Sequence, residues 1–284
     1  MSTVGLMVHR DRPAGRRLAI DLASWLDAQG HLVRVGSGDA AAVPELDPWA
    51  VSDVDEAIGA DLDLAVSIGG DGTMLRTVQL VSRNGVPVLG INVGHLGYLT
   101  EVEPAAWQPA LQRVLSGDFQ VEERMTLDVT LVGQEDAEPC TALNDAVVEK
   151  LESGHTVRVG VTVSGRPAIS YTADAVIVAT PTGSTAYNLS AGGPLVSPRL
   201  QALVITPVAA HSLLGRPIVV AGDEVVRIDV LAGRAVLGVD GRRWGELKAG
   251  AAVECRAGTN PARLVTFGER DFWSIVKAKF GLKE

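Results

Sequence analysis

The sequence of residues 63–80, DLAVSIGGDGTMLRTVQL, decides how the first part of the chain is built. Residues 63–68 form a short apolar run of the kind that a buried parallel strand shows. Residues 74–80 carry a helical pattern that opens after the hydroxyl residue Thr73. The glycines between them are therefore expected at a strand-to-helix turn, where parallel sheets bind their ligands.

The turn itself, Gly69-Gly70-Asp71-Gly72-Thr73, combines features of a phosphate site with a carboxylate. Glycines let a ligand approach the backbone closely, and the start of a helix offers unpaired N–H groups to an anion. A carboxylate at that point is unfavourable unless it holds a metal or takes a proton from an attacking hydroxyl. The turn suggests phosphoryl transfer to an alcohol, and a Gly-Asp-Gly turn without chemistry is the alternative.

Composition narrows the class of protein. The 284 residues are 46% hydrophobic and include 31 glycines, which is typical of a soluble α/β protein with an ample core. The net charge of -9 gives no general attraction to nucleic acid or anionic lipid, so we expect neither partner. We expect a cytoplasmic protein, because no apolar run approaches the roughly 20 residues of a membrane span and no secretory signal is recognisable.

Strand and helix patterns alternate over the first 120 residues or so. Strands are predicted at 4–8, 31–35, 63–68 and 86–91, and helices at 14–28, 74–80 and 104–115. This alternation predicts a Rossmann-like α/β domain over residues 1–122, with helices on both faces of a parallel sheet.

From about residue 121 the pattern changes to short strands separated by glycine-bearing turns. The predicted strands are 126–132, 142–149, 156–163, 175–179, 202–205, 218–220, 224–231, 235–239, 252–256 and 264–267. They predict an all-β sandwich domain over residues 123–267. The last segment, 268–284, contains an amphipathic stretch at 272–280, and we expect it to pack back on the first domain because a short isolated helix is marginal in water.

A second glycine-rich stretch, ADAVIVATPTGSTAYNLSAGG at residues 173–193, lies in the β half. Its hydroxyl side chains and tyrosine supply many hydrogen-bond donors at low bulk, which suits a ligand with ribose and phosphate oxygens. The alternative is a turn-rich loop whose side chains and backbone satisfy one another.

With these stretches in place, the chain resembles the NAD kinases. The resemblance depends on GGDGT at 69–73, Leu143-Asn144-Asp145, Ala173-Asp174 and ATPTGSTAY at 179–187, with supporting segments at 94–99, 211–217 and 239–241. It runs through nearly the whole chain. GGDG alone is shared with diacylglycerol-type lipid kinases and phosphofructokinases, whereas ATPTGSTAY after a Leu-Asn-Asp segment is far more specific.

The resemblance implies an enzyme that transfers the terminal phosphoryl group of ATP to the 2′-hydroxyl of the adenosine ribose of NAD, giving NADP. It also implies a divalent cation, such as Mg²⁺ carried with the ATP, and a homodimer or homotetramer. No dedicated metal site is expected in the protein itself. The sequence leaves open whether inorganic polyphosphate replaces ATP.

The resemblance also implies roles for individual residues. Asp71 is the expected catalytic residue, which contacts the NAD ribose and accepts the proton of its hydroxyl. The expected phosphate-binding residues are Gly69, Gly70, Gly72, Thr73 and Arg76, although Arg76 is equally well explained as a solvated side chain. The expected NAD-binding residues are Asp71, Gly72, Asn144, Asp145, His155, Asp174, Thr185, Ala186, Tyr187, Asn188, Leu189 and Ser190.

Some of these residues have simpler explanations. Asp145 is one methylene shorter than the glutamate usual at its position in the family, which affects its reach. His155 is equally well explained as a turn residue. Tyr187 is alternatively explained as an aromatic side chain of the core. Arg242, which follows Asp240-Gly241, is the weakest assignment and is alternatively explained as a hairpin residue. His211 is expected to pack at a strand end and is not included among the catalytic residues.

Two other functions stay open at this point. One is another GGDG-type kinase with a lipid or sugar hydroxyl as its acceptor, although a lipid kinase usually shows a basic or apolar membrane-facing surface. The other is a dinucleotide-binding sensor without activity. Asp71 argues against a sensor, because binding alone does not need a base at that position.

Overall fold

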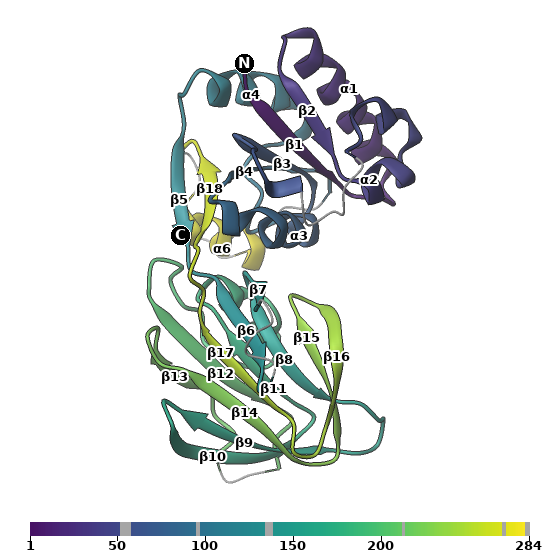
Figure 1. The fold of residues 1–284 in the computed structure, drawn as a ribbon. Coiled ribbons are helices and arrows are strands. Elements are labelled where there is room, and N and C mark those ends of the chain that lie inside the picture. Colours follow the sequence, from purple (N-terminus) through teal and green to yellow (C-terminus); the bar gives the residue numbers. More distant parts are fainter. Residues whose placement is uncertain (52–57, 95–96, 134–138, 212–213, 269–270, 282–284) are drawn as a thin grey trace. The chain divides into compact units, whose positions relative to one another are not determined.

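The computed structural model describes residues 1–284 except for 52–57, 95–96, 134–138, 212–213, 269–270 and 282–284 (Figure 1). Contacts divide the chain into two units. One consists of Met1–Glu123 with Ala262–Glu284, and the other of Arg124–Pro261. Each unit has its own hydrophobic core.

The first unit is built on a six-stranded sheet with the strand order β2-β1-β3-β4-β18-β5. Its strands are β1 (Thr3–Val8), β2 (Leu32–Val35), β3 (Leu64–Gly69), β4 (Pro87–Asn92), β5 (Gln120–Arg124) and β18 (Ala262–Thr266). Strand β1 pairs in parallel with β2 and β3, and β4 pairs in parallel with β3 and β18. The predicted parallel sheet is confirmed, and its central strands are almost entirely buried, as their continuous apolar runs require.

Helices connect these strands. They are α1 (Pro13–Ala28), α2 (Ser37–Ala42), η1 (Pro44–Trp49), α3 (Asp71–Val81), η3 (Ser82–Asn84), η4 (Pro104–Ala106) and α4 (Trp107–Leu115). Helix α3 begins earlier than predicted, at Asp71 instead of after Thr73. The reason is that the N–H groups of Thr73 and Met74 already donate to the carbonyl of Gly70, at 3.0 and 3.1 Å, so Thr73 lies inside the first turn.

The second unit contains two six-stranded sheets, ordered β10-β9-β14-β17-β6-β7 and β13-β12-β11-β8-β15-β16. The first has β6 (Leu127–Leu131), β7 (Cys140–Ala142), β9 (Val157–Val163), β10 (Arg166–Ala173), β14 (Val226–Ala232) and β17 (Ala252–Ala257). The second has β8 (Asp145–Lys150), β11 (Ala175–Ala179), β12 (Ala202–Val208), β13 (Ile218–Ala221), β15 (Arg234–Val239) and β16 (Arg242–Lys248).

Neighbouring strands in both of these sheets are antiparallel, and side chains from both sheets form one core. The predicted β-sandwich is therefore confirmed. Three of its strands, β7, β10 and β16, were not predicted, and all three are edge strands. β7 has only three residues, and β16 has mostly exposed side chains without the apolar alternation that marks a strand. β10 does alternate, since Ile169, Tyr171 and Ala173 are separated by Ser170 and Thr172, but the prediction did not use this pattern.

The predicted second domain extends to residue 267, but the second unit of the structure ends at Pro261. Strand β18, which we had assigned to the sandwich, pairs in parallel with β4, with Arg263 opposite Pro87 and Leu264 opposite Val88. A short apolar run predicts a strand but does not tell which sheet accepts it.

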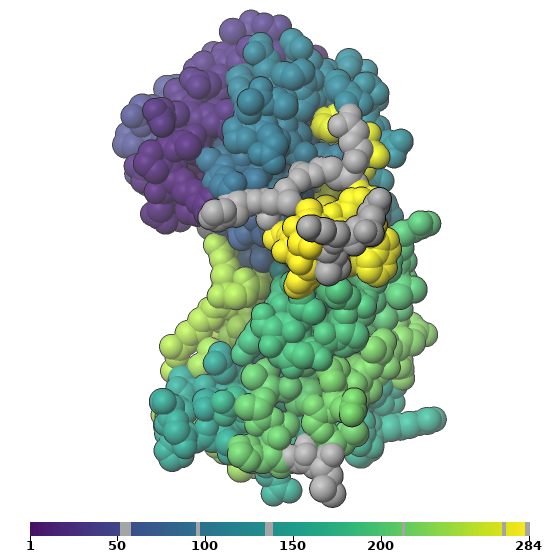
Figure 2. Space-filling view, turned by 180° about the vertical axis from the view of Figure 1, so that it is seen from behind, coloured from purple at the N-terminus to yellow at the C-terminus, as the bar shows by residue number. Residues whose placement is uncertain are grey.

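The C-terminal helix α6 (Phe272–Phe280) belongs to the first unit, as expected. The Asp271 carboxylate caps it by accepting from the N–H groups of Trp273 and Ser274. Lys279 Nζ lies 4.2 Å from the ring centre of Tyr98 in the same unit. The helix lies at the surface, with Trp273 and Phe280 half exposed (Figure 2). Among the described residues, no helix has the length and apolar character needed to cross a membrane.

Candidate active site

The GGDG turn lies where the sequence predicted, since β3 ends at Gly69 and α3 begins at Asp71. Its glycines have different surroundings. A Cβ at Gly69 would overlap the side chain of Thr73, whereas no described atom lies within 4 Å of the Cβ position of Gly70 or Gly72. Gly70 is extended (φ -119°, ψ -163°), which any residue adopts. Neither backbone conformation nor packing of the described residues therefore requires glycine at position 70, which is what a turn open to a ligand would show.

The Asp71 carboxylate is held in a fixed orientation by the segment that follows β4. Oδ2 accepts a hydrogen bond from the N–H of Tyr98 at 2.9 Å, and Oδ1 accepts one from the N–H of Leu99 at 3.1 Å. A Cβ at Gly97 would overlap Oδ1, so the glycine lets this backbone come close. Asp71 is half-buried beside the open glycines. It is thus a carboxylate fixed in position, as a general base needs to be.

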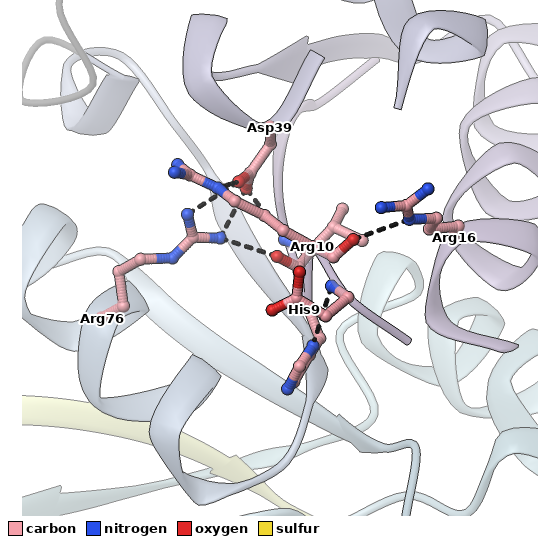
Figure 3. Close-up of polar contacts among 7 residues, drawn as sticks. His9, Arg10, Arg16, Asp39 and Arg76 are labelled. Atoms are coloured by element: carbon pink, nitrogen blue, oxygen red, sulfur yellow. Dashed lines mark hydrogen bonds and ion pairs between the residues drawn. The ribbon is translucent and has the colours of Figure 1, made fainter. Parts of the chain in front are cut away.

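Arg76 forms a bidentate ion pair with Asp39, a buried acid that the sequence analysis missed (Figure 3). Its NH1 and NH2 donate to the two carboxylate oxygens at 2.7 and 2.6 Å, and NH2 also donates to the carbonyl of Val8 at 2.9 Å. Arg10 donates to the same carboxylate at 2.7 Å, and the Val8 N–H does so at 2.9 Å.

Burial alone would raise the pKa of Asp39, but the hydrogen bonds and charge of Arg76 hold it below its ordinary value. The side chain of Arg76 is only 12% exposed, so it is not the solvated residue of the alternative explanation. The ion pair fixes α3 against the end of β1. No local sequence pattern predicts this ion pair, because Arg76 and Asp39 are 37 residues apart.

In the second unit, Asp240 organises the Leu143-Asn144-Asp145 segment. Its carboxylate accepts from three consecutive N–H groups, those of Leu143 and Asn144 at 2.8 Å and that of Asp145 at 3.1 Å. On the other side of this segment, Thr180 donates from its N–H to the carbonyl of Asn144 at 2.8 Å and from its hydroxyl to that of Leu143 at 2.6 Å. The Leu-Asn-Asp and ATPTGSTAY motifs, far apart in sequence, are therefore bonded together.

Three of the predicted NAD-binding residues lie in one electrostatic cluster. Asp145 is 4% exposed, and its burial, followed by the charge of Asp240, raises its pKa to about 7. Asp174 forms an ion pair of 2.7 Å with Lys150, which the sequence analysis had not singled out. Burial and the charges of Glu149, Asp174 and Asp145 together raise the pKa of Tyr187. Because Tyr187 is 39% exposed, the core-aromatic alternative is wrong.

The loop of residues 180–193, with η5 (Thr182–Thr185) and α5 (Tyr187–Ser190), satisfies many of its own polar groups. Asn188 is fully buried. Its Nδ2 donates to the carbonyls of Ser184 and Pro194 at 3.0 and 3.1 Å, and its Oδ1 accepts from the Thr206 hydroxyl at 2.6 Å. The side chain of Asn188 thus holds the loop together. This agrees with the alternative explanation of this stretch, a turn-rich loop whose side chains and backbone satisfy one another.

Other predicted residues around this loop are accessible. Thr185, Ala186 and Leu189 are partly buried, and Ser190 is exposed. His155 is exposed in the connection between β8 and β9, and its N–H donates to the carbonyl of Glu152 at 3.4 Å.

A parallel sheet with a GGDG turn and a fixed carboxylate, combined with a β-sandwich unit, defines the class of GGDG-type phosphotransferases. Comparison with known families agrees. Residues 4–119 match the ATP-NAD kinase N-terminal domain, and residues 143–267 match the ATP-NAD kinase C-terminal domain. The chain belongs to the NAD kinase family.

Individual relatives cover almost the whole chain. The NAD kinase of Moorella thermoacetica is 42% identical over 286 residues, covering 100% of this chain and 90% of the relative. The NAD kinase of Heliobacterium modesticaldum is 40% identical, covering 98% of each.

Two solved structures share the fold. A yeast NADH kinase complexed with NADH aligns with a TM-score of 0.87 at 25% identity, covering 100% of this chain and 89% of the other. An NAD kinase from Archaeoglobus fulgidus in complex with ATP aligns with a TM-score of 0.76 at 24% identity, covering 100% of both chains.

Proposed function

We propose that the chain phosphorylates NAD with ATP as donor. In this reaction the 2′-hydroxyl oxygen of the adenosine ribose forms a bond to the γ-phosphorus, the bond from that phosphorus to the bridging oxygen breaks, and ADP leaves. The proton of the hydroxyl goes to Asp71. The observation that carries the proposal is the Asp71 carboxylate, whose two oxygens are fixed by the N–H groups of Tyr98 and Leu99 beside glycines with open faces.

The role of base follows from this geometry. A carboxylate held by backbone donors needs no rearrangement before it accepts a proton, and a positioned base typically contributes about 10²–10⁴ in rate. Backbone N–H groups at the start of α3 are suited to phosphate oxygens. We therefore assign phosphate binding to Gly69, Gly70 and Gly72. Thr73, whose N–H already donates to the Gly70 carbonyl, is assigned through the family resemblance.

For the dinucleotide, we assign binding to the polar groups of the motifs of the second unit. Asn144, Asp145, Asp174 and Tyr187 are the main candidates, since Asp240 and Thr180 fix the segment that carries the first two. The loop from Thr185 to Ser190 would add further contacts, with Asn188 acting through the shape of the loop. His155 is assigned only through the family resemblance.

We propose that a divalent cation arrives with the nucleotide, as the family resemblance implies. Among the residues that the structure describes, no three His, Cys, Asp or Glu side chains are grouped to hold a metal ion. Mg²⁺ keeps several waters and binds readily through substrate phosphates. It would neutralise the charge that develops on the phosphates during transfer.

Two further assignments follow from the family and the substrates. A homodimer or homotetramer is proposed, which light scattering tests directly. A cytoplasmic location is proposed because ATP and NAD are the substrates.

The decisive experiment offers the purified protein ATP and Mg²⁺ with NAD, NADH, diacylglycerol or a hexose in separate reactions. NADP is measured with an NADP-specific dehydrogenase. We expect NADP from the NAD reaction and no phosphorylated lipid or sugar. Phosphorylation of a lipid or sugar without NADP would overturn the proposal in favour of another GGDG-type kinase, and binding of NAD without turnover would indicate a sensor. A parallel reaction with inorganic polyphosphate tests the second donor.

A further inference from the structure

Arg12, in the turn between β1 and α1, reaches across the sheet edge. Its NH1 donates to the carbonyl of Val93, which follows β4. In the sheet, β3 lies between β1 and β4. A side chain that begins after β1 and ends at Val93 must therefore pass the carboxyl end of β3, which is where the GGDG turn begins.

Both ends of this crossing are bonded to β3 or to its turn. The N–H of His9, after β1, donates to the carbonyl of Ile68 at 2.9 Å. The N–H of Val93 donates to the carbonyl of Gly69 at 2.7 Å. A Cβ at Gly94 would overlap Arg12 NH1, so the glycine makes room for the guanidinium. The backbone thus accommodates the guanidinium of Arg12 at this edge.

Unlike the charges of Arg10 and Arg76, the charge of Arg12 is not neutralised by a carboxylate of the described residues. Arg10 and Arg76 both donate to the carboxylate of Asp39 (Figure 3). Among the described residues, the acceptor of the Arg12 guanidinium is a neutral carbonyl, and no carboxylate forms an ion pair with it. Arg12 is half-buried, and a partly desolvated cation is favourable when an anion pairs with it.

We propose that Arg12 is a ligand of the donor phosphates. NH1 stays on Val93, and the remaining guanidinium donors face phosphate oxygens held on the open side of Gly70 and Gly72. An arginine suits this task because its planar fork makes charge-assisted bonds to phosphate. The sequence analysis gave the cationic role to Arg76, whose charge the structure commits to Asp39. The identity of the donor as ATP rests on the proposed function.

The test measures binding without turnover. The affinity of a non-hydrolysable ATP analogue with Mg²⁺, and that of inorganic tripolyphosphate, are determined by calorimetry for the wild type, Arg12→Gln and Arg17→Gln. Arg17 is the control because it is an exposed arginine in α1, the helix that follows Arg12. We expect Arg12→Gln to weaken both ligands by about tenfold or more and to leave the KM for NAD within about twofold. Equal loss of ATP and NAD affinity, or affinities within about twofold of the wild type, would overturn the inference.

Two more variants keep the test valid if Arg12→Gln is poorly folded. Arg12→Lys keeps the charge without the fork and should recover part of the tripolyphosphate affinity. Gly94→Ala keeps Arg12 but displaces its guanidinium, so it should raise the KM for ATP without changing that for NAD. Unchanged donor binding in a folded Gly94→Ala would count against the proposed position of the guanidinium.

The two proposals fail separately. If Arg12→Gln loses tripolyphosphate binding while the wild type makes no NADP, the phosphate site stands and the acceptor assignment falls. If the wild type makes NADP and Arg12→Gln binds both ligands normally, the function stands and Arg12 is not a phosphate ligand.

Discussion

The two glycine-rich segments of the chain use glycine for opposite purposes. In the GGDG turn, the Cβ positions of Gly70 and Gly72 face open space. In the 180–193 loop, a Cβ at Gly183 would overlap the backbone of Asn144, and one at Gly193 would overlap the side chain of Asn188. Gly70 and Gly72 therefore leave room for a ligand, whereas Gly183 and Gly193 allow the chain to pack closely on itself. Gly69, which packs on Thr73, and Gly192, which has open space and a positive φ, do not follow this division.

The polar side chains differ in the same way. Asp71 is held by backbone N–H groups at the half-exposed edge of its turn. By contrast, Ser184 bonds to the backbone of Val196, just after the loop, and Asn188 donates to the carbonyls of Ser184 and Pro194. The two segments are similar in composition but differ in role. The GGDG turn carries the expected catalytic group, whereas the 180–193 loop shapes a binding surface. Changes in the first should affect catalysis and donor binding, and changes in the second should first affect stability.

The largest effect is expected from Asp71→Asn. The amide keeps the shape of the side chain but no longer accepts the proton, so kcat should fall by about 10²–10⁴. Binding of NAD should change by less than about tenfold, or roughly 1.4 kcal/mol. Steady-state kinetics and calorimetry measure the two quantities. Asp118→Asn, at an exposed ion pair with Arg113, is the control. A kcat equal to that of the wild type would remove the role of base from Asp71.

Gly183→Ala should be the most destabilising change in the second segment. Its new methyl group would meet the carbonyl of Asn144, a backbone atom that also accepts from Thr180 and cannot easily move. Overpacking of this kind costs about 1–3 kcal/mol in the free energy of unfolding, which urea denaturation measures. Gly245→Ala, at a strand glycine with open space, is the matched control and should be nearly neutral. Equal stability of the two variants would contradict the packing role.

The sequence predicted those parts of the molecule whose signals are local. The apolar run of β3 and the glycines after it identified the turn, and the change from helical to strand periodicity separated the two folds. Edge strands β7 and β16 were missed because one has only three residues and the other has mostly exposed side chains, whereas β10 was missed although Ile169, Tyr171 and Ala173 alternate with polar residues. The destination of β18 was missed because strand pairing is a long-range property.

The site followed the same rule. Asp71 was found from its own motif, but Arg12 meets Val93 across 81 residues and Asp240 meets Asn144 across 96. Nothing near either residue in the sequence marks these contacts. For Arg76 the local signal was misleading. Its position one turn into α3 suggested a phosphate ligand, but in the structure it forms an ion pair with the distant Asp39. Contacts between segments far apart in the sequence are the part that single-sequence reasoning does not reach.

Asp145→Asn tests how the Leu143-Asn144-Asp145 segment, which Thr180 bonds to the 180–193 loop, tolerates charge. The folded-state pKa of about 7 lies above the ordinary value of 3.8, so ionising Asp145 costs stability. This cost is absent below about pH 4, grows as the pH rises toward 7, and is complete above it. The variant should therefore be more stable than the wild type at pH 8, by on the order of a few kcal/mol, and the difference should vanish near pH 4. Urea denaturation across this range measures it, with the exposed Asp223→Asn as control. A difference that is independent of pH would exclude this origin.

The smallest effect on stability, and the sharpest test of the comparison, is expected from Gly72→Ala. Position 72 lies in the first turn of α3 with open space at its Cβ, so alanine should fit without strain. By restricting the unfolded chain it should stabilise the fold by about 0.4–1 kcal/mol. The same methyl group would occupy the space that we assign to phosphate, so the affinity for an ATP analogue should fall. Gly69→Ala is the counterpart within the same turn, because its methyl group would overlap Thr73 and should lower stability. A Gly72→Ala protein that is more stable and binds the donor normally would mean that the open face serves no ligand, and the distinction between the two glycine segments would be lost.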